Sequence, residues 1–134
     1  MSALDYRAVP RIAALDLSGS AGLYVKLGAE NACSLATDGA IGAEDLDGVI
    51  VQGGGNASGG TVTVAVDGIV EAFAGATLTS GTHRLLTVDG TSRLVPAVAG
   101  KMVVAEWVGQ FQGSGGAGKL TKVRLCKVPY VLDT

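Results

Sequence analysis

The segment from Gly113 to Lys119 has the spacing closest to a ligand-binding motif. Gly113, Gly115 and Gly118 satisfy GxGxxG, and Lys119 falls where a P-loop pattern places its lysine. A phosphate cradle needs a helix that begins at this lysine, because the helix amides and dipole must face the anion. Here the residues after Lys119 alternate like a strand, and Leu120 replaces the P-loop hydroxyl. We therefore predict a flexible hairpin loop rather than a nucleotide site.

Three carboxylates, Glu44, Asp45 and Asp47, gather just before Gly48. A calcium ion takes about six to eight oxygen ligands, and this segment lacks the long ligand-bearing loop of an EF-hand. We predict a solvated loop closed by Gly48, with no metal site.

The remaining reactive side chains do not form a recognisable catalytic set. His83 is the only histidine, and neither Cys33 nor Cys126 has a spacing typical of a nucleophile paired with a base. The two cysteines lie far apart and form no CxxC pair. The sequence leaves their pairing with each other open, but without an export signal two reduced, buried thiols are the favoured expectation. Trp107 lies in an apolar run and is predicted in the core or a subunit interface. We predict no enzyme activity, no cofactor and no catalytic or metal-binding residues.

Composition excludes several classes of protein. The 134 residues carry a net charge of −2 and are 16% charged and 48% hydrophobic, with a mean hydropathy of +0.41. This balance argues against nucleic-acid and anionic-membrane partners and against disorder. No stretch provides the roughly 18 apolar residues of a spanning helix. Asp5 and Arg11 interrupt any signal-peptide core, which predicts synthesis in a cytoplasm. The chain therefore has surplus apolar surface and little charge to cover it.

Short alternating runs separated by glycine predict an all-β fold, a small barrel, β-tulip-like domain or sandwich. In the clearest run, Val62, Val64 and Val66 are expected to face a core or interface while the threonines face outward. Asp67-Gly68 and Asp89-Gly90 are typical of hairpin turns. The other expected strands are Leu23–Leu27, Cys33–Ala36, Gly48–Gln52, Ile69–Phe73, Arg84–Val88, Arg93–Pro96, Met102–Val108 and Leu120–Cys126.

The order of these strands recurs with an offset of about sixty residues. Each series has a strand, a polar turn, a short strand, a buried strand, a glycine-rich loop and an alternating strand. The first series runs from Tyr24 to Val66, and the second runs from Arg84 to Leu125. The repetition lies in the pattern rather than in residue identity.

Residues 1–20 lack clean periodicity and end in Ser18-Gly19-Ser20, which is typical of a linker. We therefore expect an extended N-terminal arm over residues 1–20 and a single β domain over residues 21–134. A lipoyl or biotinyl carrier barrel is a less favoured alternative, because Gly100-Lys101-Met102 does not fit the modified hairpin of such carriers.

The stretch from Tyr24 to Leu125 resembles the small capsid decoration, or cement, proteins of tailed bacteriophages. The similarity consists of glycine and valine at turn and strand positions. Its pieces are Leu23–Gly28, Gly48–Val51, Thr61–Ala72, Ala76–Gly81, Val88–Gly90, Leu94–Pro96 and Val103–Glu106.

This resemblance implies a β-barrel or β-tulip core, an arm that binds the capsid, and trimers on the outside of the virion head. The implied partners are the major capsid protein and further copies of the chain, with no nucleic acid or membrane. The arm residues expected to contact the shell are Tyr6, Arg7, Pro10, Arg11 and Ile12. A β-rich domain of a phage fibre, tail or surface-attachment assembly is the alternative function.

Overall fold

The computed structural model describes residues 5–52, 59–78, 84–111 and 117–130. Its described part is all-β, as predicted, with a single short 3-10 segment, η1 (Ala29–Asn31). The strands are β1 (Asp5–Ala13), β2 (Tyr24–Leu27), β3 (Ala32–Leu35), β4 (Asp45–Gln52), β5 (Thr61–Phe73), β6 (Leu85–Val88), β7 (Leu94–Pro96), β8 (Met102–Phe111) and β9 (Leu120–Pro129).

The first five strands close into a ring, which we call the first barrel. β5 pairs antiparallel with β1 and with β4, and β2 pairs antiparallel with β4 and with β3. The ring closes where β1 meets β3 in parallel, at Ile12–Ala32 and Ala13–Cys33. Closure is confined to these two pairs, so the sheet edge is removed only where β1 meets β3.

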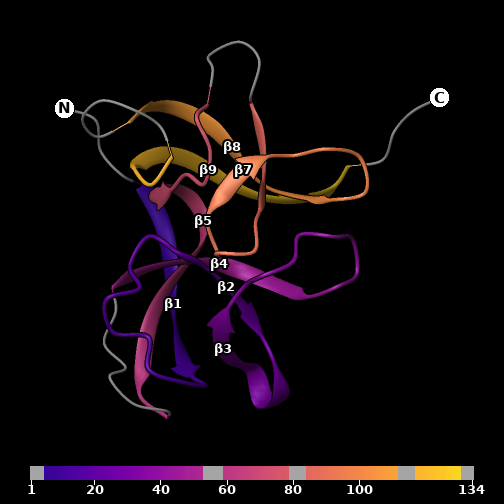
Figure 1. Cartoon of the computed structure of the whole chain (residues 1–134). Helices are drawn as coiled ribbons and strands as arrows, with labels where there is room; N and C mark the ends of the chain where they lie inside the picture. The colour runs from indigo at the N-terminus through magenta and orange to yellow at the C-terminus, as the bar shows by residue number, and fades with distance from the viewer. Residues whose placement is uncertain (1–4, 53–58, 79–83, 112–116, 131–134) are drawn as a thin grey trace.

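The second half of β5 begins another set of pairings, which we call the second barrel. β5 pairs antiparallel with β9, β9 with β8, β8 with β6, and β6 with β7. An isolated parallel bridge between Ala74 and Leu94 joins the two ends of this series. Figure 1 shows the barrels one above the other, with the long strand β5 running through both.

The residue pairings show that the second barrel repeats the first. Val25 pairs with Leu35 on β3 and with Gly48 on β4. At the equivalent place, Leu86 pairs with Pro96 on β7 and with Ala105 on β8. The contact Ala13–Cys33 closes the first barrel, and Ala74–Leu94 closes the second. Both residues of the second contact lie about sixty positions after their counterparts in the first. The predicted repeat is therefore present as a repeated strand topology and register.

Equivalent positions also fill the two cores. The first barrel encloses the buried side chains Ala13, Leu17, Val25, Cys33, Ile50, Val62 and Val64, with Val66 partly buried beside them. The second barrel uses Ala74, Leu78, Leu86, Leu94 and Val123 at matching places, and Trp107 packs where the first barrel has Ile50. Alternation with period two supplies these inward faces.

The N-terminal segment differs from the expected arm. Residues 5–13 are extended, but they form β1 and pair with β5 from Asp5 to Ile12. Ala13 and Leu17 are fully buried in the core of the first barrel. Residues 5–13, expected in the arm, therefore belong to the first barrel, which closes through the pairing of β1 with β3.

The expected turn at Asp67-Gly68 is also absent, because β5 continues through these residues as one strand. Gly68 takes a positive φ of 96° inside the strand. The pairing with β1 shifts register between Arg7 and Ala8, leaving one extra residue on β5, which is a β-bulge. Gly68 has partners on both sides, Tyr6 on β1 and Leu125 on β9, which favour a continuous strand.

The predicted hairpin at Asp89-Gly90 joins β6 to β7, which pair antiparallel. Its turn is longer than the dipeptide. The Asp89 N–H donates to the Arg93 carbonyl, and the positive φ falls on Ser92, at 67°. The Asp89 carboxylate accepts hydrogen bonds from the N–H and the hydroxyl of Thr91.

Candidate interaction surfaces

The residues expected to contact a shell all lie on β1, but only some are available on the surface. Tyr6 is 39% exposed and Ile12 is 51% exposed, and Arg7 and Pro10 are exposed as well. Arg11 is engaged within the chain, because its guanidinium donates to both carboxylate oxygens of Asp47 at 2.9 and 3.0 Å. Ion pairing with Asp47 raises the pKa of Arg11.

The acidic segment Glu44–Asp47 is not a solvated loop. β4 begins at Asp45, and the side chain of Asp47 is only 3% exposed at a register shift between β2 and β4. A buried carboxylate requires a paired cation or hydrogen bonds, and Arg11 supplies both. The prediction of a solvated loop missed this ion pair because its two members are 36 residues apart.

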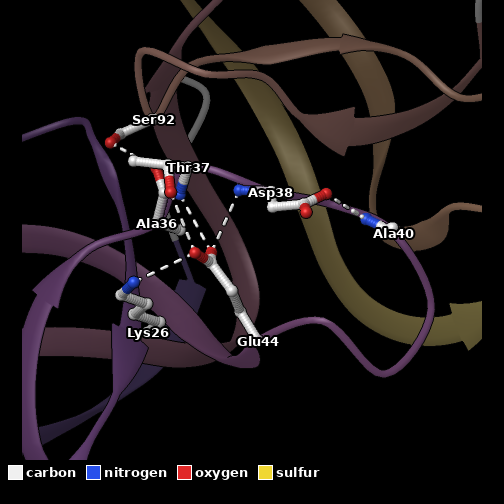
Figure 2. Close-up of polar contacts among 7 residues, drawn as sticks. All are labelled: Lys26, Ala36, Thr37, Asp38, Ala40, Glu44 and Ser92. Carbon is white, nitrogen blue, oxygen red and sulfur yellow. Dashed lines mark hydrogen bonds and ion pairs between the residues drawn. The ribbon is translucent and has the colours of Figure 1, made fainter.

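Glu44 fixes the connection between β3 and β4, as Figure 2 shows. Its carboxylate accepts hydrogen bonds from the Thr37 and Asp38 N–H groups, the Thr37 hydroxyl and the Lys26 ammonium, at 2.9–3.0 Å. Burial by itself would raise the pKa of Glu44, but these donors together lower it to about 2. The side chain is 10% exposed, so it acts as an internal anchor.

The segment that Glu44 anchors lies against the second barrel. The Ser92 hydroxyl donates to the Ala36 carbonyl, and the Met102 N–H donates to the Gly39 carbonyl. The Ile41 N–H donates to the Gly100 carbonyl. Residues 36–44 therefore form a strap that holds the two barrels together.

Trp107 lies partly buried on β8, against the core of the second barrel. Its indole N–H donates to the Thr121 hydroxyl at 2.8 Å. Thr121 occupies the position that Val62 has in the first barrel, so a polar pair replaces an apolar contact there.

The sequence candidates for chemistry do not converge. His83 and Gly113–Gly116 lie outside the described residues. Lys119 is followed by β9, not by the helix that a phosphate cradle needs. Lys101 lies between β7 and β8, which do not pair with each other, so it is not at a hairpin tip. In the described ranges, no cluster of three His, Cys, Asp or Glu side chains could hold a metal ion.

Neither cysteine is in a disulfide. Cys33 is fully buried in the first barrel, whereas Cys126 is partly buried on the outer face of β9. Burial raises the pKa of both thiols, and the Glu106 charge raises that of Cys126 further. Both thiols are therefore poorly ionised near neutral pH.

A shallow groove of about 340 Å³ lies on the outer side of the second barrel. We call this surface the outer face of the second barrel; it is lined by Leu85, Val103, Glu106, Arg124, Cys126 and Val128. Leu85 is 40% exposed and Val128 is 54% exposed. The alternation of Arg124, Cys126 and Val128 along β9 is a sequence signal that these side chains share one face of the strand. It gives no sign that this face stays exposed to solvent instead of packing against another part of the chain.

A charged triad borders this groove. Glu106 lies between two arginines, accepting from Arg84 Nε at 2.8 Å and from Arg124 Nη1 at 3.0 Å. The side chains of Arg84 and Arg124 are 73% and 57% exposed. The two arginines carry two positive charges and Glu106 one negative charge, so this rim of the groove has one net positive charge.

No protein-family model matches the chain, and no curated protein is significantly similar to it in sequence. Over the described part of the chain, no helix is long and apolar enough to cross a membrane.

Proposed function

We propose that the chain is a structural virion protein that binds the outside of a tailed-bacteriophage capsid and stabilises the shell. In this role it acts as an oligomer, with a trimer as implied by the family that it resembles, and it performs no catalysis. Its partners are the major capsid protein and further copies of itself.

The open edge of β1 carries this proposal. One edge of β1 pairs with β5, while the other pairs with β3 only at Ile12 and Ala13. From Tyr6 to Arg11 this second edge has no partner strand in the described part of the chain. An open edge can receive a strand from another protein, and exposed Tyr6 and Ile12 add apolar contact beside it.

A cement protein spans the joints between shell subunits through several modest contacts. When copies are linked in an oligomer, these contacts act together, and avidity raises the overall affinity without new chemistry. The resemblance over Tyr24–Leu125 and the exposed apolar side chains support this role.

The experiment is to locate and count the protein in purified phage particles and then to measure its binding to expanded empty heads. We expect a regular copy number on the head. Ile12→Asp should reduce bound copies at least tenfold, while Val98→Asp, at a 59% exposed position away from β1, should bind as the wild type does. Absence of the protein from particles, or its presence only in tails or fibres, would overturn the proposal.

A further inference from the structure

The two barrels of the chain touch through different faces. In the first barrel, the face bearing Tyr24, Val49 and Ala65 is almost completely buried, with exposures of 1%, 0% and 0%. These side chains belong to the core cluster that also contains the side chains of the second barrel. The second barrel therefore covers this face.

The register identifies the same face on the second barrel. Tyr24 pairs with Val49, and Val49 pairs with Ala65. The equivalent pairs are Leu85 with Glu106 and Glu106 with Arg124. These three residues belong to the outer face of the second barrel, so the surface that is covered in one repeat is open in the other.

A specific turn contributes to the covering. In the second barrel, the β6–β7 turn presents the Ser92 carbonyl to the Tyr24 N–H at 2.9 Å. The equivalent turn of the first barrel joins β2 to β3 and contains η1. Both turns are closed by the same hydrogen bond, Gly28 N–H to the Ala32 carbonyl and Asp89 N–H to the Arg93 carbonyl, each 2.8 Å.

The β2–β3 turn is exposed at Gly28, Ala29 and Glu30. In Figure 1 it lies at the end of the first barrel that points away from the second barrel. Glu30 is exposed in this turn, where its backbone takes a positive φ of 58°. Its negative charge complements the positive rim that Arg84 and Arg124 give to the outer face of the second barrel.

We propose that a second copy of this chain docks on the outer face of the second barrel and presents its β2–β3 turn there, with Glu30 beside Arg84 and Arg124. The contact joins two different surfaces, so it is heterologous and builds a closed ring or a chain of copies. The inference deepens the oligomer of the proposed function and rests on that part of it. The contact between copies and the binding to the shell can be refuted independently. Association of copies is measured on the isolated protein, whereas shell binding is measured on particles.

The test begins with the mass of the full chain in solution, measured by light scattering after gel filtration. We expect a mass above one chain for the wild type at about 100 µM, and a monomer for both Leu85→Asp and Glu30→Lys. Leu15→Asp makes the same kind of change at another exposed apolar position, 43% exposed in the first barrel, and should leave the mass unchanged. Circular dichroism melts should show that all three variants stay folded.

Mixing the two monomeric variants tests whether the turn of one copy meets the outer face of another. Leu85→Asp retains an intact turn, and Glu30→Lys retains an intact outer face, so together they should form a heterodimer through one restored contact. A two-fold arrangement of the same contact would be rescued as well, but it would hold the wild type at two chains, whereas the heterologous contact builds a larger ring or chain. A monomeric wild type, an unchanged mass in either variant, or no heterodimer in the mixture would overturn the inference.

Discussion

Arg11 and Asp47 form a two-point ion pair that ties β1 to β4, with the Asp47 side chain 3% exposed and Arg11 28% exposed. The pair lies beside the parallel contact of β1 and β3 at Ile12 and Ala13. It therefore stabilises the place where the first barrel closes.

Loss of the Arg11 cation should destabilise the protein strongly. Arg11→Met leaves a buried carboxylate without its partner, which we expect to lower the free energy of unfolding by about 2–3 kcal/mol. Urea denaturation measures the change. Arg7→Met is the control, since Arg7 is exposed on the same strand and should change stability by less than about 0.5 kcal/mol. Equal effects from the two variants would contradict this role of Arg11.

Removal of β1 should prevent folding of the first barrel. A chain that starts at Ala14 loses the strand that pairs with β5 and closes on β3, and it exposes the core around Leu17. We expect loss of the cooperative thermal transition, followed by circular dichroism. A synthetic peptide of residues 5–13, added in trans, should restore it. A truncated protein as stable as the full chain would show that β1 is a dispensable arm.

Glu44 should make stability depend on pH in the acidic range. Its pKa is about 2 in the folded protein against an ordinary 4.5, so its stabilising contribution is complete above about 4.5. The contribution is lost as the pH falls through 2. Glu44→Gln should therefore cost about 2 kcal/mol at pH 7 and much less at pH 2, as measured by urea denaturation at each pH. A gap for Glu44→Gln that stays constant down to pH 2 would count against the anchor.

Two buried threonines should respond oppositely to the same substitution. Among the described residues, the buried Thr87 hydroxyl has no hydrogen-bond partner, whereas the Thr121 hydroxyl accepts from Trp107 and donates to the Gly109 carbonyl. Thr87→Val should be neutral or raise the free energy of unfolding by about 1 kcal/mol, and Thr121→Val should lower it by about 1–2 kcal/mol. Thermal unfolding compares them directly. A destabilised Thr87→Val would mean that this hydroxyl has a partner in solution.

Much of the local structure follows from the sequence. The alternation of Val62 and Val64 with threonines predicts a strand and its inward face, and both valines are buried. The recurrence of strands at about sixty residues predicts the order in which β2–β5 and β6–β9 follow each other. Each strand in these series is recognised from its own neighbouring residues, because a half-buried strand alternates apolar and polar side chains.

Other features depend on contacts between distant residues. The acidic run before Gly48 reads as a solvated loop until Arg11, 36 residues away from Asp47, is placed against it. Asp67-Gly68 has the composition of a turn, but partners on both edges keep β5 continuous. A dipeptide preference of this kind is weak compared with strand pairing along two edges.

The sequence by itself determined that this is an all-β protein, which runs of strand are repeated and which faces are apolar, because these properties depend on residue type and short spacing. The tertiary structure decided that β1 is part of a closed barrel, that β5 serves two barrels, and that the apolar surplus lies partly on an uncovered outer face. These outcomes depend on closure of the barrels. Strands that are far apart in the sequence must pair in one register, and this pairing decides which face of the sheet is covered and which stays exposed to solvent.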